Sequence, residues 1–183
     1  MSKAVLLSIR PKWCEKIARG EKTIEVRKTK PKLETPFKCY IYCTMDHPYI
    51  SVSCGELDKL NYRTNTVGRC NGKVIGEFTC ERIALIAYDG GELSSTTNAA
   101  FSPATCLTQS EIIAYIGDKG RCYGWHMSDL RIYDTPKELS EFKTLCRVDA
   151  DCCACPYYNY TKMDCDGRVI GRPPQSWCYV EEG

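Results

Sequence analysis

Hydrophobic and polar residues follow one another in short runs, and several of these runs have the length and period of a β-strand. Residues 4–9 form a continuous apolar run, which is typical of a buried strand. Residues 23–27 and 37–44 alternate with a period of two, which is the period of a strand with two different faces. Residues 73–80 have the same character and include Gly76, where we expect a bend or a close backbone approach. The pattern therefore predicts four strands in the first 80 residues.

Turn and capping residues predict three helices between or after the strands. A first short helix begins at Pro11, where the missing N–H costs nothing, and ends at Gly20. A capping box at residues 108–111 precedes the apolar residues of a second helix, which Gly117 ends. The same capping pattern at residues 135–138 predicts a third, short helix before Leu139 and Phe142.

The remaining segments complete a mixed topology. Residues 123–133 and 176–181 are strand-like, whereas 45–72 and 89–107 have no sustained period and are expected to be long surface connections. The cysteine-rich residues 146–172 are expected to form a loop inserted before the last strand. We expect all 183 residues to form one α+β domain, a small mixed β-barrel with a few short helices.

The charge and hydropathy of the chain narrow the class of protein. No apolar run approaches the 18 to 20 residues, roughly, that cross a bilayer, and no signal-peptide core follows Met1, so we expect a cytoplasmic protein without membrane contact. The net charge is only +2. Residues 1–40, however, hold eleven Lys and Arg against four Glu. This basic end suits contact with phosphate, although a charged face can also be a solvated face.

Fourteen cysteines are unusually many for a chain of this length. Cytosolic thiols are kept reduced, so we expect free thiols and not a disulfide framework. Eight cysteines are spread along the chain, several in strand-like surroundings where cysteine behaves as a small apolar residue. These are Cys14, Cys39, Cys43, Cys54, Cys70, Cys80, Cys106 and Cys122.

The other cysteines cluster near the C-terminus and predict a structural zinc site. Cys152-x-x-Cys155 has the spacing that lets two thiolates bind one tetrahedral zinc ion, and Cys146 and Cys165 are near enough in sequence to complete four ligands. Cys153 competes with Cys152 for the same position. Loosely packed thiols and a redox or iron–sulfur role are the alternatives. Four sulfur ligands would leave no open position, so such a zinc ion would be structural and not catalytic.

The strongest candidate for function is the motif Gly20-x-Lys22-x-x-Glu25-x-Arg27 beside the first glycine turn. Two cations and one carboxylate within six residues suit a polar ligand that carries both donors and acceptors. Strand alternation places Glu25 and Arg27 on one face, and Lys22 joins them only if the strand begins after it or is bulged there. The alternative is a surface strand whose charges simply balance each other.

The order of these segments resembles the ASCH family, whose members are relatives of the PUA RNA-binding fold. The resemblance rests on residues 7–11, the short helix after them and the motif at residues 20–27. Residues 123–130 and 172–178 are similar to stretches of bacterial and phage-like members. The resemblance implies a PUA-like β-barrel that binds RNA or a modified nucleobase in a cleft lined by the motif.

The residues expected to bind this ligand come from the motif and from the ends of neighbouring strands. Aromatic residues could also stack on an unpaired base, but at strand spacing they are more often core; these are Trp13, Tyr40, Tyr42, Trp125 and Trp177. The candidate ligand-binding set is Ser8, Arg10, Pro11, Lys22, Glu25, Arg27, Arg172 and Ser176.

A hydrolase is the alternative to a binding domain. Some relatives that resemble this motif hydrolyse the acetyl amide of N4-acetylcytidine with the motif lysine, a threonine three residues later and a glutamate. Lys22 matches the lysine, but Glu25 stands where the threonine is expected. A Lys22–Glu25 pair that activates water, in an amidohydrolase or a ribonuclease, is therefore the second hypothesis. A protein-interaction module is the third.

Overall fold

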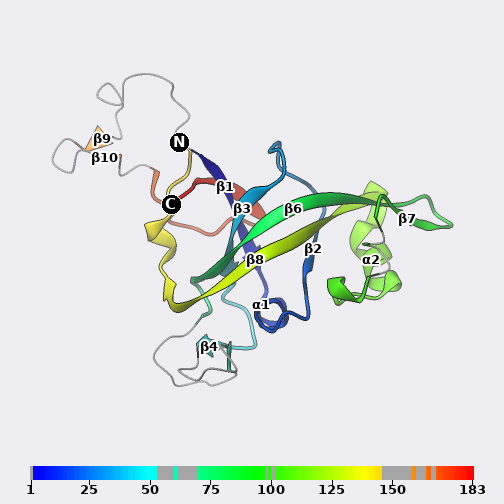
Figure 1. Cartoon of the computed structure of the whole chain (residues 1–183), viewed down its shortest axis with the longest axis horizontal. Helices are drawn as coiled ribbons and strands as arrows, with labels where there is room; N and C mark the ends of the chain where they lie inside the picture. Colours follow the sequence, from blue (N-terminus) through cyan, green and yellow to red (C-terminus); the bar gives the residue numbers. More distant parts are fainter. Residues whose placement is uncertain are drawn as a thin grey trace.

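The central feature of the protein is a mixed sheet of seven strands. In the computed structural model, the strand order is β11-β1-β3-β6-β8-β2, with β7 paired to β6 (Figure 1). All pairs are antiparallel except β1 with β3. The strands are β1 Lys3–Ile9, β2 Ile24–Arg27, β3 Phe37–Cys43, β6 Val74–Tyr88, β7 Leu93–Ser95, β8 Arg121–Lys137 and β11 Trp177–Glu181. The structure describes residues 2–52, 60–61, 70–97, 99, 102–145, 158–159, 164–165 and 168–183.

Helices and two small strand pairs complete the architecture. β4 (Ser51–Val52) pairs with β5 (Leu60–Asn61), and β9 (Tyr158–Asn159) pairs with β10 (Asp164–Cys165). The helices are α1 Pro11–Ala18 and α2 Gln109–Ile116, and the 3₁₀ turns are η2 Pro103–Thr105, η3 Gly117–Lys119 and η4 Leu139–Glu141.

Two predicted helices are confirmed, and the third is wrong in its start and type. α1 begins at Pro11, and α2 carries the full capping box with Thr108 as its N-cap. Thr135, by contrast, lies within β8, because pairing of Val74 with Lys137 extends that strand past the predicted cap. The short helix is the 3₁₀ turn η4, which is capped by Glu138.

Strands β6 and β8 are much longer than their predicted cores and form one long, curled hairpin. The register between them shifts at three places, which bends both strands and increases their twist. At Gly76 the partner strand approaches so closely that an added Cβ would lie 2.4 Å from the carbonyl oxygen of Arg131. The close backbone approach predicted at this glycine is therefore confirmed. The connection 89–107 also contains β7, which is too short to give a detectable period.

The sheet is open, so the predicted closed barrel is wrong. Its two end strands, β2 and β11, share no backbone ladder. Side chains bridge the gap instead: the rings of Trp125 and Trp177 lie 6.1 Å apart, and the Trp177 indole donates to Thr29 Oγ1 at 3.0 Å. The four-residue β2 pairs with β8 along one edge and with no described strand along the other.

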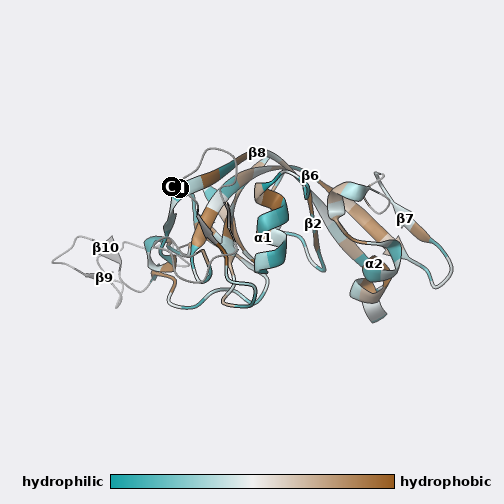
Figure 2. Ribbon diagram, turned by 90° about the horizontal axis from the view of Figure 1, so that it is seen from below, coloured by the Kyte–Doolittle hydropathy of each residue, from teal (hydrophilic) through white to brown (hydrophobic). Residues whose placement is uncertain are grey.

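Apolar residues cover both faces of the central strands. β1 is buried from Ala4 to Ile9, which agrees with its continuous apolar run. Figure 2 shows the sheet arching over α1, with α2 farther along the same side. Six of the spread cysteines are buried as small apolar residues, as predicted: Cys14, Cys39, Cys43, Cys70, Cys80 and Cys122.

The predicted zinc ligands fall outside what the structure describes. Cys146, Cys152, Cys153 and Cys155 lie outside the described residues, and of Cys165 only the backbone is described. Among the residues that are described, no three His, Cys, Asp or Glu side chains are grouped as a metal site requires. Within the same ranges, no helix combines the length and the apolar character needed to cross a lipid bilayer.

Candidate ligand-binding site

The glycine turn after α1 brings Lys22 to the same side as Glu25. Gly20 has a φ of +74°, and after it the backbone N–H groups of Glu21 and Lys22 both donate to the carbonyl of Lys16. β2 begins only at Ile24, so Lys22 precedes the strand and is free of its alternation. Lys22 can therefore lie on the same side as Glu25 and Arg27, although strand alternation alone would place it on the opposite face. The three charged side chains of the motif meet around one volume.

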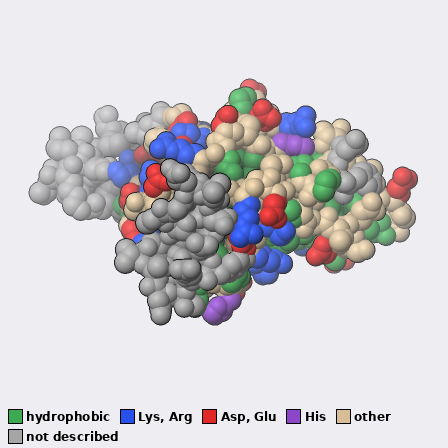
Figure 3. Space-filling view, turned by 60° about the horizontal axis from the view of Figure 1, so that its bottom comes forward, with side chains coloured by type: hydrophobic (Ala, Val, Ile, Leu, Met, Phe, Trp, Pro, Cys, Tyr) green, Lys and Arg blue, Asp and Glu red, His purple; other side chains and the backbone are tan. Residues whose placement is uncertain are grey.

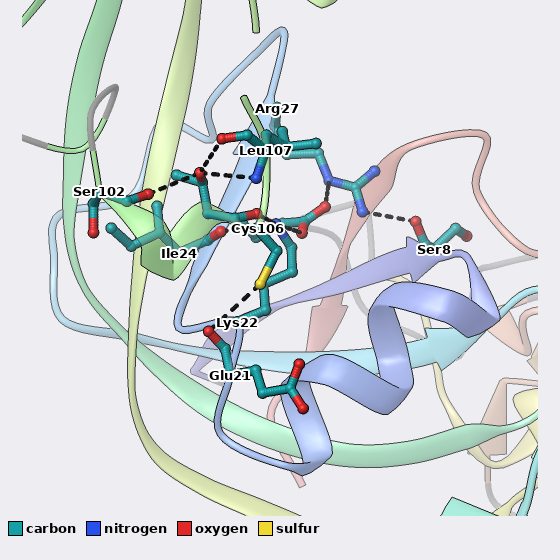
Figure 4. Close-up of polar contacts among 10 residues, drawn as sticks. Ser8, Glu21, Lys22, Ile24, Arg27, Ser102, Cys106 and Leu107 are labelled. Carbon is teal, nitrogen blue, oxygen red and sulfur yellow. Dashed lines mark hydrogen bonds and ion pairs between the residues drawn. The ribbon is translucent and has the colours of Figure 1, made fainter. Parts of the chain in front are cut away.

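Lys22 is buried, with 2% of its surface exposed, and all three of its ammonium hydrogens have an acceptor nearby (Figure 4). Nζ donates to the carbonyl oxygens of Ile24 at 2.9 Å and Thr105 at 2.6 Å. It also lies 3.4 Å from Glu25 Oε2 and 5.1 Å from the centre of the Trp13 ring. These contacts therefore hold the ammonium group in place in the site.

Glu25 lies between the two cations of the motif. Its Oε1 is 3.0 Å from Arg27 Nε, and its Oε2 faces Lys22. Both contacts are ion pairs, and within the described part of the chain neither Glu25 Oε2 nor Arg27 Nε makes an aligned hydrogen bond. A buried carboxylate with unused acceptor capacity is costly unless a partner or a ligand satisfies it.

Arg27 joins β2 to the opposite end of the sheet. Its Nη2 donates to the carbonyl oxygen of Ser8 at 2.7 Å, at the end of β1. Its Nη1 makes longer contacts of 3.4 Å with the carbonyl and hydroxyl oxygens of Ser176, just before β11. Ser8 is held in turn by a 2.6 Å hydrogen bond from its hydroxyl to the carbonyl of Pro174. The guanidinium thus closes the open side of the sheet while it orients Glu25.

These groups line a cavity of about 440 Å³, which we call the motif cavity. This volume falls within the range of sites that bind small molecules. Of the eight predicted ligand-binding residues, five line it: Ser8, Arg10, Lys22, Glu25 and Arg27. Ser176 does not line the cavity, but it contacts the guanidinium of Arg27, which does. Pro11 is buried at the start of α1, and Arg172 is exposed outside the lining.

The other lining residues are Ile9, Lys12, Trp13, Val26, Thr44, Leu107, Glu111, Tyr115 and Gln175. Of these, only Trp13 has a predicted ligand contact, as an aromatic residue that could stack on a base. Leu107, Glu111 and Tyr115 come from the segment of α2, about 85 residues after the motif. The capping box predicted this helix, but no local pattern tells which part of the sheet it covers.

Two titratable residues on the α2 side of the cavity are tuned by their surroundings. Partial burial raises the pKa of Tyr115, and the nearby Arg27 opposes this shift. The backbone N–H of Thr108, and then its hydroxyl, donate to the carboxylate of Glu111 and lower its pKa. The Glu111 charge is therefore engaged in capping α2, whereas the Tyr115 ring is neutral at physiological pH.

The space-filling view shows how charge is distributed outside the cavity. On the face that carries α1, blue Lys and Arg side chains lie beside red carboxylates (Figure 3). Several of these charges are paired: Arg10 with Asp46 at 3.9 Å and Lys16 with Glu21 at 3.1 Å. Lys12 instead lies over the Trp13 ring at 4.3 Å.

Comparison with solved structures identifies the type of fold. No protein-family model matches the chain, and no curated protein matches its sequence. An ASCH protein from Zymomonas mobilis shares 16% identity with a TM-score of 0.57, over 98% of this chain and 88% of the other. A tyrosine-to-phenylalanine variant of that protein gives 16% identity and 0.58, over 99% and 92%. A serine-to-alanine variant gives 16% identity and 0.57, over 98% and 89%. The chain therefore has an ASCH-type fold.

Proposed function

We propose that the chain binds single-stranded RNA or a modified nucleobase, with one base seated in the motif cavity. The ASCH-type fold, a relative of the PUA RNA-binding fold, supports nucleic-acid binding in general. The cavity supports a specific mode, because its volume suits one base and sugar and its walls combine charged groups with aromatic rings.

The carboxylate of Glu25 is the observation that carries the proposal. Glu25 lines the cavity and is held between two cations, and its buried Oε2 has no aligned hydrogen bond among the described residues. Such an acceptor matches the exocyclic amino or ring N–H donors on the edge of a base. Lys22 and Arg27 hold the carboxylate in one orientation, so the acceptor is formed before the ligand arrives.

The rest of the lining supports the same ligand. Trp13 and Tyr115 both line the cavity, and stacking of a base on an aromatic ring contributes about 1–3 kcal/mol in single-strand binders. Arg10 is exposed at the same cavity and can reach a phosphate outside it.

Hydrolysis is the second candidate, and one observation favours it. Thr44 lines the cavity, and its buried hydroxyl has no hydrogen-bond partner among the described residues. A threonine hydroxyl is the group that the motif itself lacks. Against a catalytic Lys22, its Nζ already donates to two carbonyl oxygens and lies beside Glu25 Oε2, so it is not free to approach a substrate.

A thermal-shift screen of the purified chain against unmodified and acylated nucleosides and short RNAs tests the proposal. A ligand that binds only the folded chain at one hundred times its Kd stabilises it by about 2.7 kcal/mol. We expect a concentration-dependent rise in Tm for the wild type. We expect the rise to be lost in Glu25→Gln, which keeps the size of the side chain and removes its charge.

Glu21→Gln is the matched control, because Glu21 is exposed and pairs with Lys16 outside the cavity. It should respond to ligand as the wild type does. Thr44→Val separates the two candidates. If the chain only binds, the variant keeps the Tm response of the wild type. If the chain is a hydrolase that uses Thr44, the wild type hydrolyses an acylated nucleoside and the variant does not. If no nucleoside and no RNA raises the wild-type Tm, the proposal is wrong.

A further inference from the structure

A second hollow, of about 390 Å³, lies beyond the end of β2, and four of its six lining residues are cations. Its lining residues are Lys28, Thr29, Lys30, Lys119, Arg121 and Tyr123, and we call it the basic groove. No predicted ligand-binding residue belongs to it, and it shares no lining residue with the motif cavity.

Strand pairing explains why these cations converge. β2 and β8 are antiparallel, and Arg27 lies opposite Tyr123 at the end of their ladder. The residues that follow Arg27 therefore run alongside those that precede Tyr123. Lys28 and Lys30 come from the first side, and Lys119 and Arg121 from the second. Residues about 90 positions apart in sequence thus form one positive surface.

The positive charge of the groove is not neutralised. Across the described ranges, no carboxylate lies within ion-pair distance of Lys28, Lys30, Lys119 or Arg121. All four side chains are exposed. Elsewhere in the described ranges, exposed Arg10 lies 3.9 Å from Asp46 and exposed Arg19 lies 2.8 Å from Glu15. Four unpaired cations around one hollow favour a ligand with several negative charges.

The groove and the motif cavity are neighbours. Arg27 lines the cavity, and the next residue, Lys28, lines the groove. Lys28 Nζ lies 5.2 Å from the centre of the Tyr115 ring, which itself lines the cavity, so Tyr115 forms the boundary between them. From Arg27 to Lys30 the backbone spans at most about 10 Å. One extended ligand can occupy both hollows.

We propose that the basic groove binds the phosphodiester backbone of an RNA strand whose base occupies the motif cavity. This inference rests on the proposed function and specifies its substrate as a strand, not a free nucleoside. Lys30 Nζ lies 5.8 Å from the centre of the Tyr123 ring, so the groove combines cations with an aromatic surface, as single-strand binding sites do. Continuity with a base-sized cavity favours RNA over an acidic peptide.

The test measures the salt dependence of binding of a fluorescein-labelled short single-stranded RNA by anisotropy. The groove variant is Lys119→Gln with Arg121→Gln. The matched control is Arg131→Gln with Lys137→Gln, which removes the same charge from the other half of β8. Each phosphate contact contributes about 0.7 to the slope of log K against log salt for a single strand. The groove variant should therefore lose about 1.4 from the slope, and the control should keep the wild-type slope.

Between about 50 and about 200 mM salt, this difference makes the wild type lose roughly sevenfold more affinity than the groove variant. Free nucleosides should stabilise all three proteins equally. If the groove variant keeps the wild-type slope while nucleosides still bind, the inference is wrong and the proposed function stands. If neither nucleosides nor RNA bind the wild type, both are wrong. A polyglutamate peptide that binds as tightly as RNA would also overturn the inference.

Discussion

The motif cavity and the basic groove meet at Tyr115, yet they treat positive charge in opposite ways. In the cavity, Lys22 and Arg27 are buried and share the carboxylate of Glu25. In the groove, Lys28 and its neighbours are exposed and have no carboxylate partner in the described part of the chain. Two consecutive residues, Arg27 and Lys28, thus belong to two different electrostatic environments.

In the proposed RNA complex, this difference would let one short segment supply both the selection of a base and the attraction of the phosphate backbone. Buried, paired charges are weakly screened by salt and hold fixed directions, so they can select a particular base edge. Exposed, unpaired charges attract any phosphate chain and are strongly screened, so they supply affinity that depends on salt. Substitutions in the two regions should therefore differ in what they change: stability in the cavity, and salt-dependent binding in the groove.

The largest effect is expected for Glu25→Leu. Removing the carboxylate leaves Lys22 and Arg27 buried without a counter-charge, and breaking a buried ion pair in this way costs about 3–5 kcal/mol of unfolding free energy. Urea denaturation of wild type and variant measures it. Glu21→Gln, which breaks the exposed pair with Lys16, should cost no more than about 1 kcal/mol. Equal losses in the two variants would show that Glu25 is not buried between the cations.

Arg27→Lys should cost less, about 1–3 kcal/mol, although it keeps the charge. Lysine cannot reach Glu25 and the carbonyl of Ser8 together, because it lacks the planar fork of donors that spans them. The same denaturation series measures the loss. An unchanged midpoint would mean that the guanidinium does not bridge β2 and β1.

Alkaline pH should lower the free energy of unfolding, because the protein buries several cysteine thiols. Burial raises the pKa of the Cys80 thiol to about 12 and that of Cys122 to about 11, above the ordinary value of 9.0. The folded chain therefore keeps protons that the unfolded chain loses above pH 9, so stability is constant below this value and falls as pH rises through it. Each such thiol contributes up to about 1.4 kcal/mol per pH unit.

Denaturation midpoints at pH 7, 8 and 10, roughly, measure this dependence. Alkylation adds a second readout, because buried protonated thiols react slowly at neutral pH. A denaturation midpoint that does not fall between pH 8 and 10, roughly, would contradict the burial of these thiols.

The groove variant, Lys119→Gln with Arg121→Gln, should change stability least, by about 0.5 kcal/mol or less, because both side chains are exposed and form no ion pair with a described carboxylate. Its effect should appear only in the salt dependence of RNA binding. A large loss of stability would show that the groove is part of the packing and not a binding surface.

The zinc hypothesis predicts that loss of the metal ion leaves ligand binding in the motif cavity unchanged. Elemental analysis of the purified chain should give about one zinc per molecule, and Cys155→Ser should lose it. RNA affinity should stay unchanged, because a four-thiolate site has no open position for a ligand. A metal-free chain of normal stability would contradict the hypothesis.

Local patterns predicted the elements that are defined by local chemistry. The apolar run of β1, Pro11 at the start of α1 and the capping box at Thr108 each depend on residues within one or two turns, and each is confirmed. The barrel was wrong because closure depends on whether β2 and β11 pair, and these strands are about 150 residues apart. No local period carries that information.

The candidate site divides in the same way. The motif residues lie within six positions, so their convergence could be anticipated, except that the start of β2 at Ile24 decides the side on which Lys22 falls. Tyr115 and Thr44 reach the cavity only because α2 and the end of β3 pack there. The basic groove was equally hidden, since its two halves meet through the pairing of β2 with β8.

The most direct test of the motif cavity as the ligand site is an NMR titration of the isotope-labelled wild type with a nucleoside. We expect the backbone amides of residues 22–27 and the indole N–H of Trp13 to shift together and to saturate with one affinity. Shifts confined to residues outside the cavity, or no saturable shift in residues 22–27, would contradict the account.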